Sequence, residues 1–494
     1  MTHVTDVTPA AAGKRRHRVA GPGGPVATDQ IRKPQERHRK AGLVTASAII
    51  VLSLLAGACG GSRASSSDEN ASTSKAAAAT DFGTMPSPCG NGEAKGATQK
   101  GVTDTSITIG YGDDAGYPGS PGLNKEIADA MKAMIKWCND QGGINGRQII
   151  GDYHDAAILN VNNAVTDACT KDFMLVGSGF ALDGAGEATR LGCKLAAVPT
   201  YTVSPEFANA TLMVQPTPNP VNWYDASNAF LIAEKFPTQV KKAAIFEGNF
   251  AATIDSADKA EIAYEQAGWQ FMDNCRLQYA IAGESTYLPF IQRLKDCGAE
   301  VVYFSGSPAP IFQNVLDAAK QSDFSPIWVT EANGYTEQFA KWNTSGNADK
   351  VYTRMTYYPF EQAADHPATA KYIELVKANG GAISLLGAQA TAAFLLWAQG
   401  AKTCGSNLTS DCVLAELAKV HDYDAGGLQS PTDPGKNLPG NCGMVVNLQG
   451  TTWKQVLPTT LGTQACDPKY LVKISGAVVD RANLDANGNS RPKG

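Results

Sequence analysis

Short apolar runs alternate with helix-like segments along most of the chain, and residues 106–153 give the clearest example. Residues 106–110 alternate polar or small side chains with isoleucine, a pattern typical of a strand. A loop of small and acidic residues follows. Apolar side chains then recur at three- and four-residue spacing, as on one face of a helix: Ile127, Met131, Met134, Ile135 and Cys138. Residues 148–150 form a second apolar run, so this order predicts a strand–helix–strand unit of a parallel sheet, with a crevice at the carboxyl ends of its strands.

Further short apolar runs recur along the chain, each followed by small or polar residues. They are residues 173–176, 195–198, 243–246, 301–304 and 327–329. Such runs are typical of parallel strands that are buried on both faces, with loops emerging at their ends. Helical segments between them include residues 255–267 and 287–297. The pattern therefore predicts an α/β fold built from doubly wound sheets.

The N-terminal region has the pattern of an export signal. Residues 43–55 are apolar, but the run is short for a bilayer-spanning helix and has the length of a signal-peptide core. Residues 55–59 read Leu-Ala-Gly-Ala-Cys and resemble the bacterial lipobox, although Ala56 stands where leucine is usual. We interpret residues 1–58 as a signal peptide with a basic extension and expect lipidated Cys59 to anchor the protein on a membrane. The alternative is an ordinary signal peptide cleaved after an alanine.

Three other segments change this picture only slightly. Residues 59–102 are rich in serine and alanine and are expected to form a flexible tether. Residues 476–494 are expected to form a polar tail. Residues 381–402 are strongly apolar, but Gly387 and Gln389 interrupt the run, which favours a core helix over a membrane span.

Charge and cysteine content restrict the function further. The formal charge of −5 combines +6 over residues 1–58 with −11 over the rest of the chain. An acidic body does not offer the basic stripe that nucleic acids require, so we expect no nucleic-acid partner. Ten of the eleven cysteines lie after residue 80, and export makes disulfides the expected state. Their spacing favours these pairs: Cys169 with Cys193, Cys275 with Cys297, Cys404 with Cys412, Cys442 with Cys466, and the remaining Cys89 with Cys138. Buried free thiols are the alternative.

Catalytic motifs are missing from the sequence. It contains no G-x-S-x-G elbow, no H-E-x-x-H motif and no phosphate-binding P-loop. Only His154, His366 and His421 lie beyond the export region, and no cysteine pair has the C-x-x-C spacing of a zinc site. We therefore expect a protein that is not an enzyme and that uses no cofactor or metal.

Several of these features together resemble a known family. The features are the lipobox, the alternating first strand, the sequence Gly-Gly-Ile-Asn-Gly-Arg at 142–147, the Cys169 and Cys193 pair, and Ser-Pro-Glu at 204–206. They resemble the branched-chain amino acid type of solute-binding proteins of ABC importers, over about residues 103–475. The resemblance implies a type I periplasmic binding protein fold, in which two α/β lobes joined by three crossing strands close over a small molecule.

The resemblance also implies a division of the chain and a set of partners. Lobe one is expected at residues 103–247 and 356–445, and lobe two at residues 248–355 and 446–475. The implied partners are a small-molecule solute and the membrane-bound ABC permease, with the protein itself a monomer. The same fold also serves lipoproteins that sense a ligand for a membrane receptor, so sensing is the alternative function.

Residues just after the strands are the candidates for ligand binding, because ligands of doubly wound sheets bind there. They are Tyr117, Ser178, Phe180, Ala181, Thr202, Glu247, Ser307 and Glu331. Tyr117 is expected to cover an apolar face of the ligand, or else to be a surface tyrosine. By resemblance, Ser178, Ala181 and Thr202 lie where the family holds a carboxylate. Glu331 resembles the position that meets a ligand ammonium, or else is a solvated acid.

The sequence departs from the amino-acid binders at two places that bear on the ligand. The pattern at residues 201–204 is altered, and residues 387–390 replace a stretch that carries an aromatic residue and an acid in that family. The residues with which that family binds both the carboxylate and the ammonium group of an amino acid are therefore only partly present. An apolar or amide-type solute is therefore as plausible as leucine, and the identity of the ligand stays open.

Overall fold

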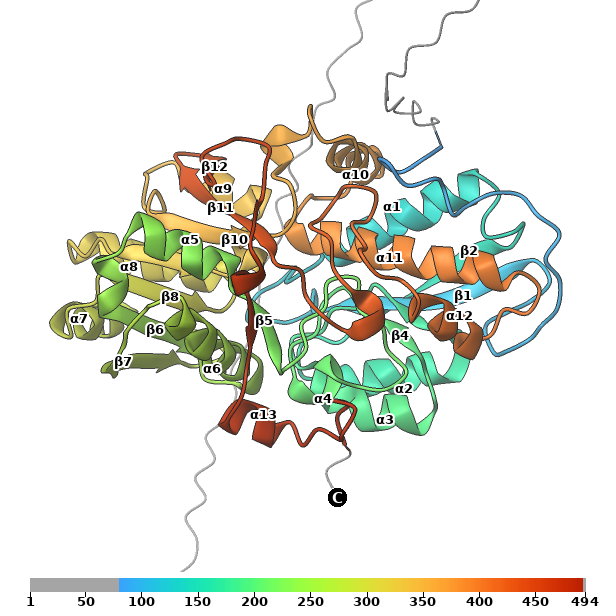
Figure 1. Cartoon of the computed structure of the whole chain (residues 1–494), viewed down its shortest axis with the longest axis horizontal. Helices are drawn as coiled ribbons and strands as arrows, with labels where there is room; N and C mark the ends of the chain where they lie inside the picture. Colours follow the sequence, from blue (N-terminus) through green and yellow to red (C-terminus); the bar gives the residue numbers. More distant parts are fainter. Residues whose placement is uncertain (1–79, 492–494) are drawn as a thin grey trace, which may run out of the picture. The chain divides into compact units, whose positions relative to one another are not determined.

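The computed structural model describes residues 80–491. The predicted signal peptide, Cys59 and part of the predicted tether lie outside the described residues. Within them, the chain forms two α/β lobes, each built around its own sheet (Figure 1).

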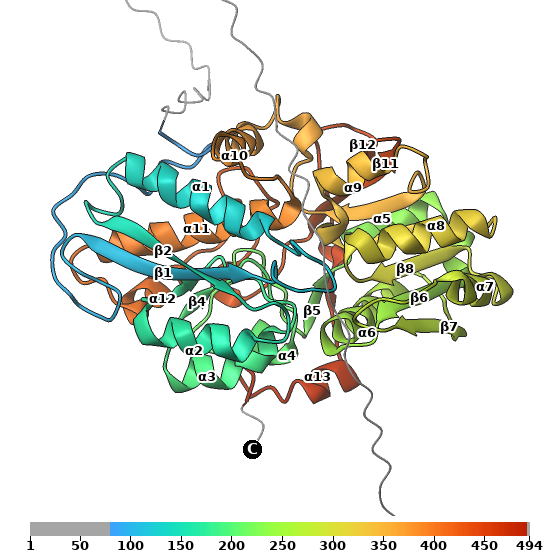
Figure 2. The ribbon, with the colours of Figure 1, turned by 180° about the vertical axis from the view of Figure 1, so that it is seen from behind.

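The first lobe contains a four-stranded parallel sheet in the order β2-β1-β3-β4. Its strands are β1 (Ser106–Asp113), β2 (Gln148–Asp155), β3 (Leu175–Val176) and β4 (Ala197–Val198). Its helices are α1 (Glu126–Asp140), α2 (Val161–Lys171), α3 (Glu187–Gly192), α4 (Pro205–Ala208), α10 (Pro367–Ala378), α11 (Leu385–Cys404) and α12 (Ser410–Leu417). Helices α1 and α11 cover one face of this sheet, and α2 and α3 cover the other (Figures 1 and 2). The predicted strand–helix–strand unit is thus present as β1, α1 and β2.

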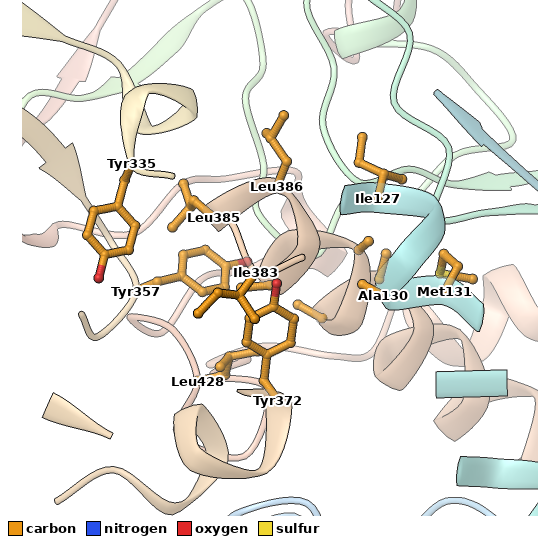
Figure 3. Packing of buried hydrophobic residues seen from close by; sticks show 14 of the residues in the cluster. Ile127, Ala130, Met131, Tyr335, Tyr357, Tyr372, Ile383, Leu385, Leu386 and Leu428 are labelled. Carbon is orange, nitrogen blue, oxygen red and sulfur yellow. The ribbon is translucent and has the colours of Figure 1, made fainter. Parts of the chain in front are cut away.

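The apolar stripe of α1 is buried as its spacing predicts, with Ile127, Met131 and Cys138 all 0% exposed. Figure 3 shows Ile127, Ala130 and Met131 beside the start of α11. Helix α11 is the segment expected to be a core helix, and nearly all of its side chains are buried. Among the residues that the structure describes, none of the helices combines the length and apolar character needed to cross a bilayer.

The motif Gly-Gly-Ile-Asn-Gly-Arg at residues 142–147 forms a turn and has a role in the fold, not in ligand binding. Gly142, Gly143 and Gly146 have φ angles of +106°, +76° and +87°, and a Cβ on Gly143 would lie 2.0 Å from the carbonyl oxygen of Arg147. Glycine is therefore required here. The Arg147 guanidinium is 1% exposed and donates to the carbonyl oxygens of Thr103 (3.0 Å), Gly405 (2.8 Å) and Gly96 (3.0 Å). The motif ties the turn to two distant segments of the lobe.

The second lobe contains a larger mixed sheet in the order β12-β11-β10-β9-β8-β6-β7, with β13 paired to β11. Its strands are β6 (Ala243–Gly248), β7 (Phe271–Tyr279), β8 (Val301–Ser305), β9 (Ile327–Thr330), β10 (Val351–Met355), β11 (Cys442–Gln449), β12 (Thr452–Leu457) and β13 (Ala465–Cys466). Its helices are α5 (Ser227–Lys235), α6 (Ala251–Gln266), α7 (Leu288–Asp296), α8 (Gln313–Gln321) and α9 (Glu337–Trp342). Strands β6 to β10 run parallel, and β11 pairs antiparallel with both β10 and β12.

The central strands β6, β8 and β9 of this sheet are buried along their whole length because helices cover both faces. Val301 and Tyr303 of β8 pack in the cluster that includes α5 and α6, whereas Val302 and Phe304 pack in the cluster that includes α7 and α8. This arrangement explains why the sequence of β8 is apolar throughout and does not alternate between apolar and polar residues.

The structure changes the predicted lobe boundaries at two strands. Residues 243–247 were expected in lobe one, and the expected boundary after residue 445 divided residues 442–449 between the lobes. In the structure, β6 lies between β8 and β7, and β11 lies between β10 and β12. An apolar run indicates that a strand is buried on both faces, but both sheets offer that environment, so the run does not specify which sheet it joins.

The chain passes between the lobes three times: after α4, after β10 and before β11. The side chain of Gln429, 2% exposed, connects these passages. Its Oε1 accepts from Tyr357 Oη (2.5 Å) and Thr217 Oγ1 (3.0 Å), and its Nε2 donates to the Pro216 carbonyl oxygen (2.9 Å). Beside them, β5 (Trp223–Asp225) pairs with β14 (Leu471–Lys473). One buried amide thus holds all three crossing segments together.

Five disulfides staple the described chain, and they join the pairs favoured by spacing. They are Cys89–Cys138, Cys169–Cys193, Cys275–Cys297, Cys404–Cys412 and Cys442–Cys466. Each joins cysteines within one lobe. The bridges therefore stabilise the lobes and leave the crossing segments free of covalent links.

Candidate functional site

A cavity of about 270 Å³ lies between the two lobes. The loops after β1, β2, β3 and β4 form one wall, and the loops after β6, β7, β8 and β9 form the other. Both sheets thus present the carboxyl ends of their parallel strands to the same space, where doubly wound folds bind ligands. Most of the lining is apolar or aromatic, and it includes Leu123, Ile158, Val221, Phe250, Ile281 and Leu386.

The structure brings five of the eight candidate residues to this cavity. Tyr117, Ala181, Thr202, Ser307 and Glu331 line it. The lobes also touch beside it, because Ser120 Oγ donates to the Ala309 carbonyl oxygen at 3.0 Å, across the gap between them. A small molecule in this cavity would be enclosed from both sides.

The other three candidates lie elsewhere. Phe180 is 4% exposed and packs in the core between β3, β4 and α2. Ser178 is 2% exposed, and its carbonyl oxygen accepts from the Thr200 amide at 2.8 Å. Glu247 is 0% exposed and accepts from Arg276 Nε at 2.9 Å, on the side facing β7. A position after a strand places a residue at one end of the sheet, but the direction of its side chain decides whether it reaches the cavity.

Glu331 lines the cavity with its charge already balanced. Arg354 Nε lies 3.2 Å from Glu331 Oε2, while Tyr224 Oη (2.7 Å) and Tyr303 Oη (3.1 Å) donate to Oε1. A ligand ammonium at Glu331 would compete with the guanidinium for the same carboxylate. In this structure, Glu331 is therefore the ion-pair partner of Arg354, and its carboxylate is not free to bind a ligand ammonium.

The backbone amides of the lobe-one wall are bound by carboxylates of the chain itself. Asp114 accepts from the amides of Ile158 and Ala181, both at 2.7 Å. Asp183 does the same for Val203 (2.7 Å) and Ser204 (2.9 Å). Burial raises the pKa of Asp114 to about 6 and that of Asp183 to about 7. Of the three positions that the resemblance assigned to a ligand carboxylate, Ala181 therefore has its amide already occupied by Asp114.

Lys259 of α6 is a lining residue that the sequence analysis missed. It is 5% exposed, and its Nζ donates to Asn219 Oδ1 and to the Pro220 carbonyl oxygen, both at 2.6 Å. Burial and, next, the nearby Arg354 lower the pKa of Lys259 well below its usual value. A sequence signal existed, because Lys259 falls at helical spacing with Ala252 and Ala263 on a buried stripe.

Residues 476–491, which we name the strap, contact both lobes next to the cavity. The strap contains α13 (Ala477–Arg481), and Val478, 4% exposed, lines the cavity. Arg481 pairs with Asp255 (3.3 Å) and Asp258 (2.7 Å) of lobe two. At its other end, the Ser490 amide donates to the Asn209 carbonyl oxygen of lobe one at 2.8 Å. These residues were predicted to be a polar tail, and the single buried valine is too weak a pattern to indicate otherwise.

The two lobes, the three crossings and the cavity between them define the architecture of a two-lobe binding protein. A family model described as periplasmic binding protein matches residues 106–452. The chain therefore belongs to the periplasmic binding protein family, whose members act outside the cytoplasm. No curated protein matches the sequence.

Solved structures of low sequence identity share this fold. The fatty acid ABC transporter substrate-binding protein from Thermomonospora curvata is 13% identical, with a TM-score of 0.62 over 77% of this chain and 97% of that one. The isoleucine complex of a branched-chain amino acid transporter substrate-binding protein from Streptococcus pneumoniae is 14% identical, with a TM-score of 0.58 over 71% and 99%. A solute-binding protein from R. palustris with 4-hydroxybenzoate is 14% identical, with a TM-score of 0.59 over 73% and 97%.

Proposed function

We propose that this protein is an extracytoplasmic solute-binding lipoprotein that captures a small molecule between its lobes and delivers it to an ABC importer. The observation that carries the proposal is the mostly apolar cavity of about 270 Å³ at the carboxyl ends of both parallel sheets. Ligand pockets of this kind are apolar with a few placed polar groups, and they form between domains. Cys59 would hold the protein at the outer face of the membrane, next to its permease.

The relatives support a transported solute without naming it. The names of the three similar structures refer to a fatty acid, isoleucine and 4-hydroxybenzoate, so this fold accepts both apolar acids and amino acids. Hinged closure around the ligand suits delivery, since a permease can then distinguish loaded from empty protein. The crossing segments held by Gln429 are the place where such a hinge would act.

A melting screen tests the proposed function. We expect at least one small molecule, among amino acids, amides, alkanoates and aryl acids, to raise the melting temperature of the purified chain. A ligand at one hundred times its dissociation constant stabilises the folded state by about 2.7 kcal/mol. Titration calorimetry on each positive compound should give one site per chain. If no compound of any charge class shifts the melt, the binding function is wrong.

A further inference from the structure

We propose that the solute is an amphipathic carboxylate whose anionic end binds Lys259 and whose apolar body lies against the remaining cavity wall. This inference rests on the proposed function and specifies its substrate class. Four properties of the cavity support it: an uncompensated cation, occupied amides on the opposite wall, a neutralised acid, and apolar surface between them.

Lys259 is the cation of the cavity wall whose charge has no acidic partner. Within residues 80–491, no carboxylate oxygen lies within ion-pair distance of its Nζ, whereas Arg354 pairs with Glu331 and Arg481 pairs with Asp255. The two acceptors of Nζ, Asn219 Oδ1 and the Pro220 carbonyl oxygen, are neutral. An ammonium group has three donors, so one remains for a ligand.

Burial disfavours the charged form of Lys259 and lowers its pKa, and a bound anion would favour that form and offset the cost of burying it. Lys259 Nζ lies 5.4 Å from the centre of the Tyr224 ring, and Arg354 Cζ lies 5.0 Å from the same centre. Two cations thus lie near one aromatic ring, and of these two only Arg354 forms an ion pair, with Glu331. An anionic ligand group at Lys259 would supply a counter-charge for the other.

The lobe-one wall of the cavity offers few free hydrogen-bond donors to a ligand anion. Asp114 and Asp183 occupy the amides of Ile158, Ala181 and Val203, so these donors are not available to a ligand anion. Thr202 Oγ1 donates to Gln215 Oε1 at 2.8 Å, so this hydroxyl is engaged as well. The anionic end of a ligand therefore favours the side of Lys259.

An amino acid fits the same cavity less well than the acid that lacks its amino group. Its ammonium would need Glu331, which Arg354 and two tyrosines already hold. Its side chain and an alkyl or aryl tail would meet the same apolar surface, formed by residues such as Leu123, Ile281 and Leu386. A cavity of about 270 Å³ limits the tail to a small aryl group or a chain of medium length.

Matched pairs of probes test the charge requirement. Octanoate and 3-phenylpropanoate would be titrated calorimetrically into the full chain, alongside octanamide and 3-phenylpropanamide, which have the same shapes without the charge. Leucine would be compared with 4-methylpentanoate, which lacks its ammonium. We expect at least one carboxylate to bind about tenfold or more tightly than its amide, and 4-methylpentanoate to bind more tightly than leucine.

Variants of Lys259 locate the binding site of the charge. Lys259→Gln and Lys259→Met should each weaken carboxylate binding about tenfold or more and leave amide binding within about threefold. Lys235→Gln, at an exposed position of α5, is the matched control and should change neither. The wild-type comparison of acid with amide needs no variant, so a variant that fails to fold does not leave the charge requirement undecided.

Failure of this inference can be told apart from failure of the proposed function. If leucine, an amide or another uncharged solute binds as tightly as the carboxylates, or if folded Lys259 variants retain carboxylate affinity, the inference is wrong while the binding function stands. If no solute of any class binds the wild-type chain, the binding function itself is wrong.

Discussion

Replacing Arg190 by methionine is expected to lower the free energy of unfolding by about 3–5 kcal/mol. Arg190 is 1% exposed, and its Nε and Nη2 donate to the Glu187 carboxylate at 2.8 and 2.6 Å. The same guanidinium donates to the carbonyl oxygens of Leu195 (2.8 Å), Leu212 (3.0 Å) and Thr211 (2.8 Å). Methionine would leave the buried Glu187 carboxylate without its cation and would remove a donor from three carbonyl groups, of which Leu212 still accepts from the Ala197 amide at 2.9 Å. Each group left unsatisfied costs stability.

Urea unfolding with the disulfides intact, followed by fluorescence and circular dichroism, measures this loss. Arg293→Met, at an exposed position of α7, is the matched control and should stay within about 0.5 kcal/mol of the wild type. The double variant Glu187→Leu/Arg190→Met should be less unstable than the sum of the two single variants, because it removes both charges. A loss below about 1 kcal/mol in Arg190→Met would contradict the pairing seen here.

The Arg190 cluster also bears on the site, since it holds the chain just before β4 and just after α4, on either side of the loop that lines the cavity. Thr211 and Leu212 follow α4, and the loop before α4 carries Thr202 and Val203 of the lining. Partial loss of solute binding in Arg190→Met would therefore reflect a displaced wall. Binding measured below the unfolding transition separates this effect from global unfolding.

The fold was accessible from sequence because its signals are local. The stripe Ile127, Met131 and Cys138 can bury itself only on one helix face, and β1 and β2 on either side then require a parallel crossover. The glycines at 142–147 likewise indicate a turn, because they adopt positive φ angles that other residues rarely adopt. Cysteines close in sequence pair because their elements are neighbours, as Cys275 of β7 and Cys297 after α7 show.

The site was accessible only in part because it depends on which distant groups meet. Sequence placed Glu331 at the end of a buried strand, but its neutralisation depends on Arg354, Tyr224 and Tyr303, which come from other elements. Asp114 resembles any loop acid until Ala181 is seen to donate to it. Lys259 gave a usable signal as a cation on a buried stripe, and a charge there needs a partner from outside the helix.

Truncating the chain before residue 476, which removes the strap, is expected to increase the rate of solute release about tenfold, which corresponds to about 1.4 kcal/mol. The strap attaches to lobe two through Arg481 and to lobe one through Ser490, whose hydroxyl also donates to the Pro205 carbonyl oxygen at 2.8 Å. Opening the lobes must break one of these attachments. Truncation would also remove Val478 from the cavity wall and admit water to the bound solute.

Stopped-flow fluorescence, with a solute that the melting screen identifies, measures the release rate directly. Arg481→Gln separates the ion pairs from the rest of the strap. Its pairs with Asp255 and Asp258 are partly exposed, and such pairs contribute only about 0–1 kcal/mol, so this variant should release solute less than about fivefold faster. Unchanged release after full truncation, in a chain that melts like the wild type, would show that the strap does not restrain the lobes. Slower release would show that it holds them apart.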